Sequence, residues 1–217
     1  MIFVDGEAKK ILKRVQDDGV GVQDGVGVWD GVDRKDFQRR HPELVSGSID
    51  IDLVAKSKKW KGSEKLVEEI CKKIIPFTDL KKILKKDLIL EVSISLVCDA
   101  QIKKINSQFR DKNHPTNVLS FCALDEKLIR KVGLKKAVKP CKHLFLGDVI
   151  ISYETVKKES LAQEKKFEDH LTHLILHSIL HLIGHDHEDK KMAKIMEDLE
   201  IKILKNFKIK NPYQQNN

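Results

Sequence analysis

The chain has 217 residues, 41% hydrophobic and 34% charged, which is enough for one sizeable domain and too little for two large ones. It contains no run of about 18 apolar residues, and acidic residues interrupt its start at Asp5 and Glu7. A membrane span and an export signal are therefore not expected. The net charge of +8 favours an anionic partner such as nucleic acid.

The first 48 residues differ in composition from the rest. Residues 18–33 carry a short period-six repeat, DGVGVQ-DGVGVW-DGVD, that is rich in Gly and Asp. Two copies and a remnant are too few to stack into a solenoid. We therefore predict that residues 1–48 form a low-complexity, disordered N-terminal extension, in which residues 1–16 can form at most a small helix.

From Ile49 onward the pattern is regular. Alternating apolar and polar residues predict strands, and apolar residues three and four positions apart predict helices. Ser63 and Asp99 are the expected N-caps of two helices. The predicted strands cover 49–54, 88–97, 117–121 and 144–151, and the predicted helices cover 63–76, 99–109, 153–163, 167–183 and 189–204.

These elements predict an α+β domain over residues 49–213, with a small mixed β-sheet packed against helices. Residues 214–217 are expected to be a disordered tail. The last predicted helix has one apolar face, formed by Met192, Ile195, Met196, Leu199 and Ile203.

The four cysteines lie far apart in the sequence and form no CxxC pair. We therefore expect reduced thiols in a cytoplasmic protein, most of them serving as small buried apolar residues. The four are Cys71, Cys98, Cys122 and Cys141.

A histidine-rich segment, HSILHLIGHDH over residues 177–187, ends the most apolar predicted helix. His177 and His181 are four residues apart, which places both imidazoles on one helical face. Gly184 is expected to end the helix, so that the chain turns back and His187 supplies a third nitrogen. Three neutral imidazoles leave one tetrahedral position open for water, which is typical of a single catalytic zinc ion.

Other polar residues near these three have less direct roles in the predicted site. A structural zinc is more often closed by a fourth Cys or His, and His185 is the candidate for that ligand, although we expect it to point away from the metal. His173 and His170 share the helical face, and we expect them to support a ligand or the core rather than to bind the metal. Asp186 is either a carboxylate that orients a ligand imidazole or an ordinary turn residue.

The spacing also matches HExxHxxGxxH, the pattern of the metzincin zinc proteases. Those enzymes carry a Glu general base directly after the first His, where this chain has Ser178. The sequence thus keeps the metal-binding pattern but lacks the residue that a protease needs for proton transfer.

Several ordered motifs resemble the YbeY family of bacterial endoribonucleases, also called rRNA maturation factors. The resemblance covers roughly residues 49–213. The motifs are HxxxHLxGxDH with the following MEDLE segment at 196–200, INSQFRDK at 105–112, PTNVLSF at 115–121 and LGDVIIS at 146–152. The chain departs from the family pattern at His185, where an aromatic residue is common, and at Ser178, where Gly is commoner.

The resemblance implies zinc on His177, His181 and His187, and a functional Arg110. A planar guanidinium suits the charge that develops on phosphate during RNA cleavage, whereas a solvated surface arginine is the alternative. Nearby lysines would attract the RNA backbone, although each is also explained as a solvated surface charge. These lysines are Lys103, Lys104, Lys112, Lys135, Lys136, Lys139 and Lys142.

The leading hypothesis is therefore a zinc-dependent, single-strand-specific endoribonuclease that acts in small-subunit rRNA 3′ end maturation and ribosome quality control. Its expected partners are ribosomal RNA and the ribosome or ribosome-associated proteins, with no membrane and no nucleotide cofactor. Two alternatives stay open. One is a metallohydrolase of another substrate, and the other is a non-catalytic ribosome-assembly factor whose zinc only braces the fold.

Overall fold

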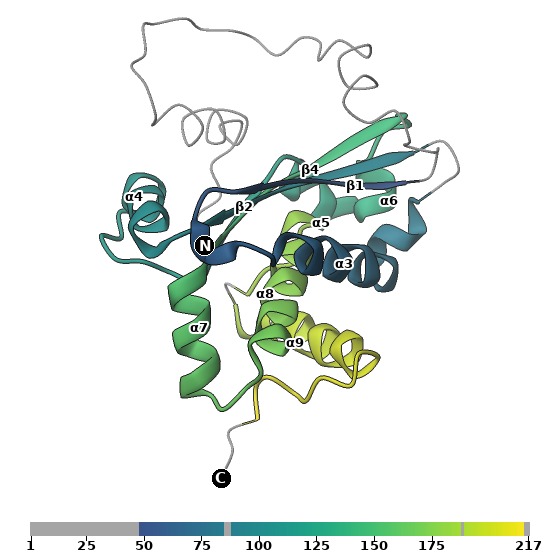
Figure 1. Ribbon diagram of the computed structural model, residues 1–217. Helices are drawn as coiled ribbons and strands as arrows, with labels where there is room; N and C mark the ends of the chain where they lie inside the picture. Colours follow the sequence, from purple (N-terminus) through teal and green to yellow (C-terminus); the bar gives the residue numbers. More distant parts are fainter. Residues whose placement is uncertain (1–47, 85–87, 188, 215–217) are drawn as a thin grey trace, which may run out of the picture.

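The computed structural model describes residues 48–84, 88–187 and 189–214 (Figure 1). The predicted N-terminal extension, with its repeat and its small helix, lies outside the described residues except for Ser48. The same holds for residues 215–217 of the predicted tail. The fold described below is that of the remaining chain.

A four-stranded mixed sheet with the strand order β1-β2-β4-β3 forms the centre of the domain. Strands β1 (Ile49–Ala55), β2 (Ile89–Val97) and β4 (His143–Ser152) run parallel to one another, and β3 (Val118–Cys122) pairs with β4 in the antiparallel direction. All four strands coincide with the predicted ones to within one or two residues. The prediction of a small mixed sheet is confirmed.

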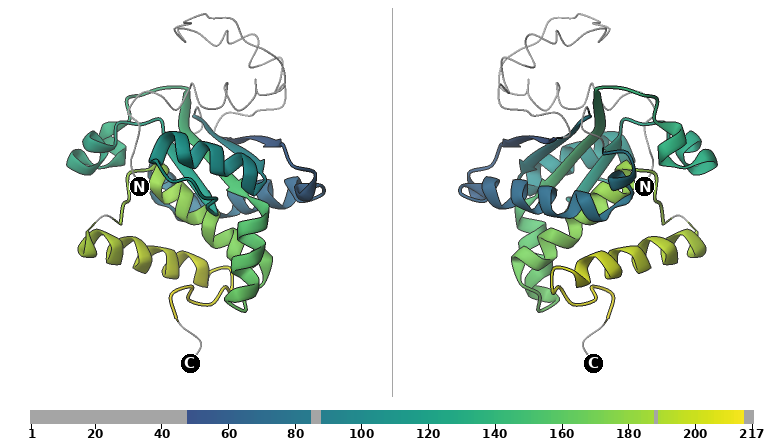
Figure 2. Two further views of the ribbon diagram at one scale, coloured as in Figure 1. Left: turned by 90° about the vertical axis from the view of Figure 1, so that its left-hand side faces the viewer. Right: turned by 90° about the vertical axis from the view of Figure 1, so that its right-hand side faces the viewer.

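Helices cover both faces of this sheet, and the larger core lies on only one of them. Helices α3 (Glu64–Ile74) and α8 (Phe167–Leu182) pack on the main core face, whereas α4 (Asp99–Arg110) lies on the opposite face over a smaller apolar cluster (Figure 1). Helix α9 (Lys190–Lys205) packs against α8 on the side away from the sheet (Figure 2). Helix α8 is thus enclosed between the sheet and α9, which explains its strongly apolar sequence.

Helix α4 begins differently from the prediction. Its N-cap is Cys98, and Asp99 is its first helical residue. The carboxylate of Asp99 instead accepts a hydrogen bond from the backbone N–H of Thr155, at 3.2 Å, in the first turn of α7 (Tyr153–Ala162). In return, Glu154 of α7 accepts a hydrogen bond from the backbone N–H of Asp99. The two helices therefore cap each other, a pairing that only the tertiary structure makes possible.

Ser63 stands at the predicted N-cap position of α3, but its side chain makes no capping hydrogen bond.

The predicted apolar face of α9 is wrong at one position, because Ile195 is 53% exposed. The structure buries the carboxylate of Glu200 on this helix instead. The apolar pattern thus predicted the helix correctly but not every residue that faces inward.

Two short helices, α5 (Glu126–Val132) and α6 (Leu134–Ala137), were not predicted. They are only seven and four residues long and are separated by Gly133, so neither shows a clear helical period.

No helix in the described ranges is long and apolar enough to cross a bilayer. All four cysteines are free, as expected, but the expectation that most of them are buried is wrong. Only Cys71 is buried, whereas Cys98 and Cys122 are half-buried and Cys141 is exposed.

Candidate metal centre

The C-terminal end of α8 carries the histidine pair, and a tight turn brings in the third histidine. Gly184 adopts a left-handed conformation with φ of 89°. The backbone N–H of Gly184 donates to the carbonyl of His181, and that of His185 donates to the carbonyl of Leu180, each at 3.0 Å. This is a Schellman motif, so Gly184 ends the helix as predicted and sends the chain back toward the pair.

The imidazoles of His177, His181 and His187 converge at this turn. One ring nitrogen from each lies within 4.8 Å of the other two. The Nε2 atoms of His177 and His181 are 3.1 Å apart, and the ring of His187 is stacked on that of His177 with a centroid distance of 5.5 Å. His181 is buried and His187 is exposed, so the cluster opens to solvent on one side.

The chemistry of these donors fits a zinc ion. Burial first, and then the neighbouring His177 and His187, lower the pKa of His181 to about 2, so its ring is neutral and has a nitrogen lone pair available for metal. Two nitrogen ligands of a tetrahedral zinc ion lie about 3.3 Å apart. The 3.1 Å separation of the two Nε2 atoms is close to that distance. Within the described residues, no fourth His, Cys, Asp or Glu completes the group.

A buried carboxylate that sequence reasoning missed holds one of the three rings. Glu200 of α9 is fully buried, and its Oε1 lies 2.9 Å from Nδ1 of His177. Its Oε2 lies 3.0 Å from Nε2 of His173 and accepts a hydrogen bond from the hydroxyl of Tyr213. His173 therefore supports the site through Glu200 and does not belong to the metal-binding group.

The pKa of Glu200 reflects two opposing effects. Burial acts to raise it, but hydrogen bonds from His173 and His177 outweigh burial and hold the pKa at about 2. Burial and the nearby carboxylate raise the pKa of Tyr213, so its hydroxyl keeps its proton and remains a donor. Glu200 is thus an ionised buried group compensated by three hydrogen-bond donors.

Asp186 is buried and acts on the backbone of the turn. Its Oδ1 accepts a hydrogen bond from the backbone N–H of His187 at 2.7 Å, and its Oδ2 lies 3.3 Å from a guanidinium nitrogen of Arg130 in α5. Among the described residues, no imidazole is a hydrogen-bond or ion-pair partner of Asp186. Asp186 therefore holds His187 through the main chain, and Arg130 ties the turn to α5.

The two remaining histidines near the cluster point elsewhere. Nε2 of His185 lies 3.8 Å from a carboxylate oxygen of Asp79, outside the metal-binding group, as expected. Nε2 of His170 lies 2.9 Å from Glu159, whose carboxylate also accepts a hydrogen bond from Asn117 at 2.9 Å. His170 is therefore a hydrogen-bonded core residue, consistent with the prediction.

Arg110 is the last residue of α4 and lies in the layer on the other face of the sheet from α8. It is partly exposed to solvent. The structure brings it into contact with none of the three histidines. The lysines expected to attract RNA are all exposed: Lys103, Lys104, Lys112, Lys135, Lys136, Lys139 and Lys142.

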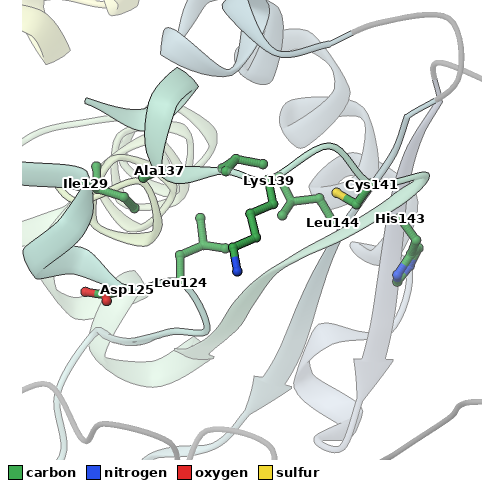
Figure 3. Close-up of a pocket in the computed structure, with 9 residues that line it drawn as sticks. Leu124, Asp125, Ile129, Ala137, Lys139, Cys141, His143 and Leu144 are labelled. Carbon is green, nitrogen blue, oxygen red and sulfur yellow. The ribbon is translucent and has the colours of Figure 1, made fainter. Parts of the chain in front are cut away.

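A pocket of about 300 Å³ lies beside α5 and α6 (Figure 3). Ile129 lines it and also packs against Gly184, so α5 separates the pocket from the histidine turn. None of the three histidines contributes to its wall. The pocket is therefore not part of the candidate metal centre.

Comparison with known proteins agrees with these features. A family model described as endoribonuclease YbeY matches residues 52–208. The endoribonuclease YbeY of Bartonella quintana is 39% identical over 167 residues, which cover 77% of this chain and 98% of that protein. The one from Agrobacterium fabrum is 35% identical over 170 residues, which cover 76% and 95% respectively.

Among solved structures, the solution structure of TM1509 from Thermotoga maritima is similar to the chain at 26% sequence identity and a TM-score of 0.45. The match covers 73% of this chain and 91% of that one. The match to the family model, over residues 52–208, includes β2, β3, β4, α8 and the histidine turn described above, together with the later part of β1. The chain belongs to the YbeY family.

Proposed function

We propose that the protein is a zinc-dependent, single-strand-specific endoribonuclease that acts in ribosomal RNA maturation, at the 3′ end of the small-subunit rRNA, and in ribosome quality control. The observation that carries the proposal is the convergence of three imidazoles on one solvent-open point, in a chain whose relatives are named endoribonucleases. Ribosomal RNA and the ribosome or its associated proteins are the proposed partners, and the cytoplasm is the proposed location.

In this proposal the three histidines hold one zinc ion. When bound, the ion supplies a Lewis acid and makes a water molecule acidic enough to ionise near neutral pH. His181 stays neutral because it is buried, and His187 is held by the backbone contact of Asp186. The exposure of His187 leaves an approach for a polymeric substrate.

Arg110 is proposed to bind the phosphate of the substrate. A guanidinium donates two parallel hydrogen bonds to phosphate oxygens, and Arg110 is partly exposed to solvent. Exposed lysines on α4 and α6 and a net charge of +8 support attraction of an RNA backbone without sequence reading.

One observation argues against hydrolysis of a peptide in the manner of metzincins. Ser178, at the position of their general base, is fully buried, and its hydroxyl donates to the carbonyl of Leu174 at 2.8 Å. It cannot reach a substrate on the exposed side of the cluster. A bracing zinc in a non-catalytic assembly factor is less well supported, because such sites are usually closed by a fourth Cys or His ligand.

A ribonuclease assay tests the proposal. Purified protein is incubated with single-stranded and structured RNA, after chelator treatment and again after zinc is restored. We expect cleavage of single-stranded RNA that disappears with the chelator and returns with zinc. Zinc binding without cleavage of either RNA would favour the assembly factor, and cleavage that persists in chelator would contradict metal dependence.

A further inference from the structure

Glu200 is a fully buried acidic residue that contacts the histidine cluster through His177. It lies on α9, at the interface with α8, and accepts hydrogen bonds from His177, His173 and Tyr213. An ionised carboxylate without such donors would be costly in the interior. The three donors supply that compensation.

The carboxylate determines which nitrogen of His177 carries the proton. An ionised carboxylate only accepts hydrogen bonds, so the bond at 2.9 Å requires the proton on Nδ1 of His177. In the neutral ring, Nε2 then has the free lone pair. Nε2 is also the atom that faces His181, at 3.1 Å. Glu200 therefore both orients the ring and directs its lone pair into the cluster.

The segment after α9 closes over this carboxylate. Tyr213 donates its hydroxyl proton to Glu200, and its ring meets the ring of His173 edge-on with a centroid distance of 5.6 Å. The neighbouring carbonyl of Pro212 accepts a hydrogen bond from Nζ of Lys165 at 2.8 Å, which ties the segment to the connection between α7 and α8. The C-terminal segment is thus linked to the histidine cluster through one side chain.

We propose that Glu200 is a positioning residue that holds His177 in the tautomer and orientation of a metal ligand, and that Tyr213 and His173 hold Glu200 in place. This proposal rests on the proposed zinc site. Groups that support metal-binding histidines in this way change metal affinity by roughly 10- to 100-fold when they are removed. The C-terminal segment would then contribute to metal binding without containing a ligand.

Glu200→Gln tests the proposal in the full-length protein. The amide keeps the volume of the side chain, but it brings two donors of its own and cannot accept all three hydrogen bonds. We expect zinc affinity, measured by competition with a chromogenic chelator, to fall by roughly 10- to 100-fold. Tyr213→Phe should give a smaller loss in the same direction. Asp198→Asn, an exposed acid on the same helix, is the matched control and should bind zinc like the parent.

A second measurement separates positioning from simple packing. Nitrogen-15 NMR of the metal-free protein reports the tautomer of His177. We expect the proton on Nδ1 in the parent and a mixture of tautomers in Glu200→Gln. Unchanged zinc affinity and an unchanged tautomer in that variant would overturn the proposal, even if its melting temperature fell. A parent protein that binds no zinc would contradict the proposed function instead, and the tautomer would still decide whether Glu200 orients the ring.

Discussion

A Cβ atom on Gly184 would lie 2.7 Å from Cγ2 of Ile129, so the turn between the histidines is packed directly against α5. The same glycine has a φ of 89°, which L-residues rarely adopt. Backbone conformation and close packing therefore both require glycine at this position. This contact connects the turn between the histidines to α5, a helix that carries none of the three histidines.

Gly184→Ala should lower the free energy of unfolding by about 2–4 kcal/mol, because it adds a steric clash to backbone strain. Gly62→Ala is the matched control, since Gly62 has a similar φ of 86° but nothing within 4 Å of its Cβ position. Gly62→Ala should lower the free energy of unfolding only by the backbone strain, about 1 kcal/mol. Urea denaturation measures the free energy of unfolding of both variants. Equal decreases would show that the side chain of Ile129 moves aside without destabilising the protein.

His181→Ala should strip the proposed zinc ion. The ring of His181 is the buried member of the cluster and lies against both other rings. Its loss leaves only two of the three histidines that make up the group in the described residues. Metal analysis after dialysis measures zinc per chain. His185→Ala serves as the control, because His185 points toward Asp79, and it should retain its zinc. Full zinc occupancy in His181→Ala would refute the assignment of this site.

Arg110→Glu should abolish RNA cleavage while zinc content and melting temperature stay near those of the parent. Arg110→Lys should lose only part of the activity, because it keeps the charge but not the two-pronged geometry. Lys103→Glu reverses an exposed charge on the same helix and controls for general electrostatics. If both Arg110 variants cleave RNA at the parent rate, Arg110 does not bind the substrate phosphate.

Asp148→Asn should stabilise the protein, and more so at high pH. Burial first, and then Glu91 and Asp52, raise the pKa of Asp148 from 3.8 to about 8, and Ser93 opposes this only in part. A raised pKa in the folded state means that stability is fully present below pH 3.8 and is lost as pH rises toward 8. Asparagine removes that loss because it never ionises.

Urea denaturation at acidic and mildly alkaline pH checks this effect. The gain from Asp148→Asn should be larger by about 2 kcal/mol or more at the higher pH. Asp198→Asn, an exposed acid, should show almost no difference between the two conditions. A gain that does not depend on pH would mean that Asp148 is already ionised in the folded protein.

The pattern of the chain predicted the elements and the three converging histidines well. The strands follow from alternation, and the pair His177 and His181 follows from helical spacing. The turn at Gly184 follows from the preference of glycine for a left-handed conformation. Each of these inferences depends on residues close together in the sequence, where backbone geometry alone sets the distance between side chains.

Sequence by itself therefore determined the fold class, the family and the histidine cluster of this protein. Only the tertiary structure decided the partners of that cluster: Glu200 with Tyr213 for His177, and Arg130 with Asp186 for the turn. It also decided that Asp99 caps α7 rather than its own helix. The physical reason is that these contacts join separate elements, and the packing of whole layers, not a local period, determines which side chains meet.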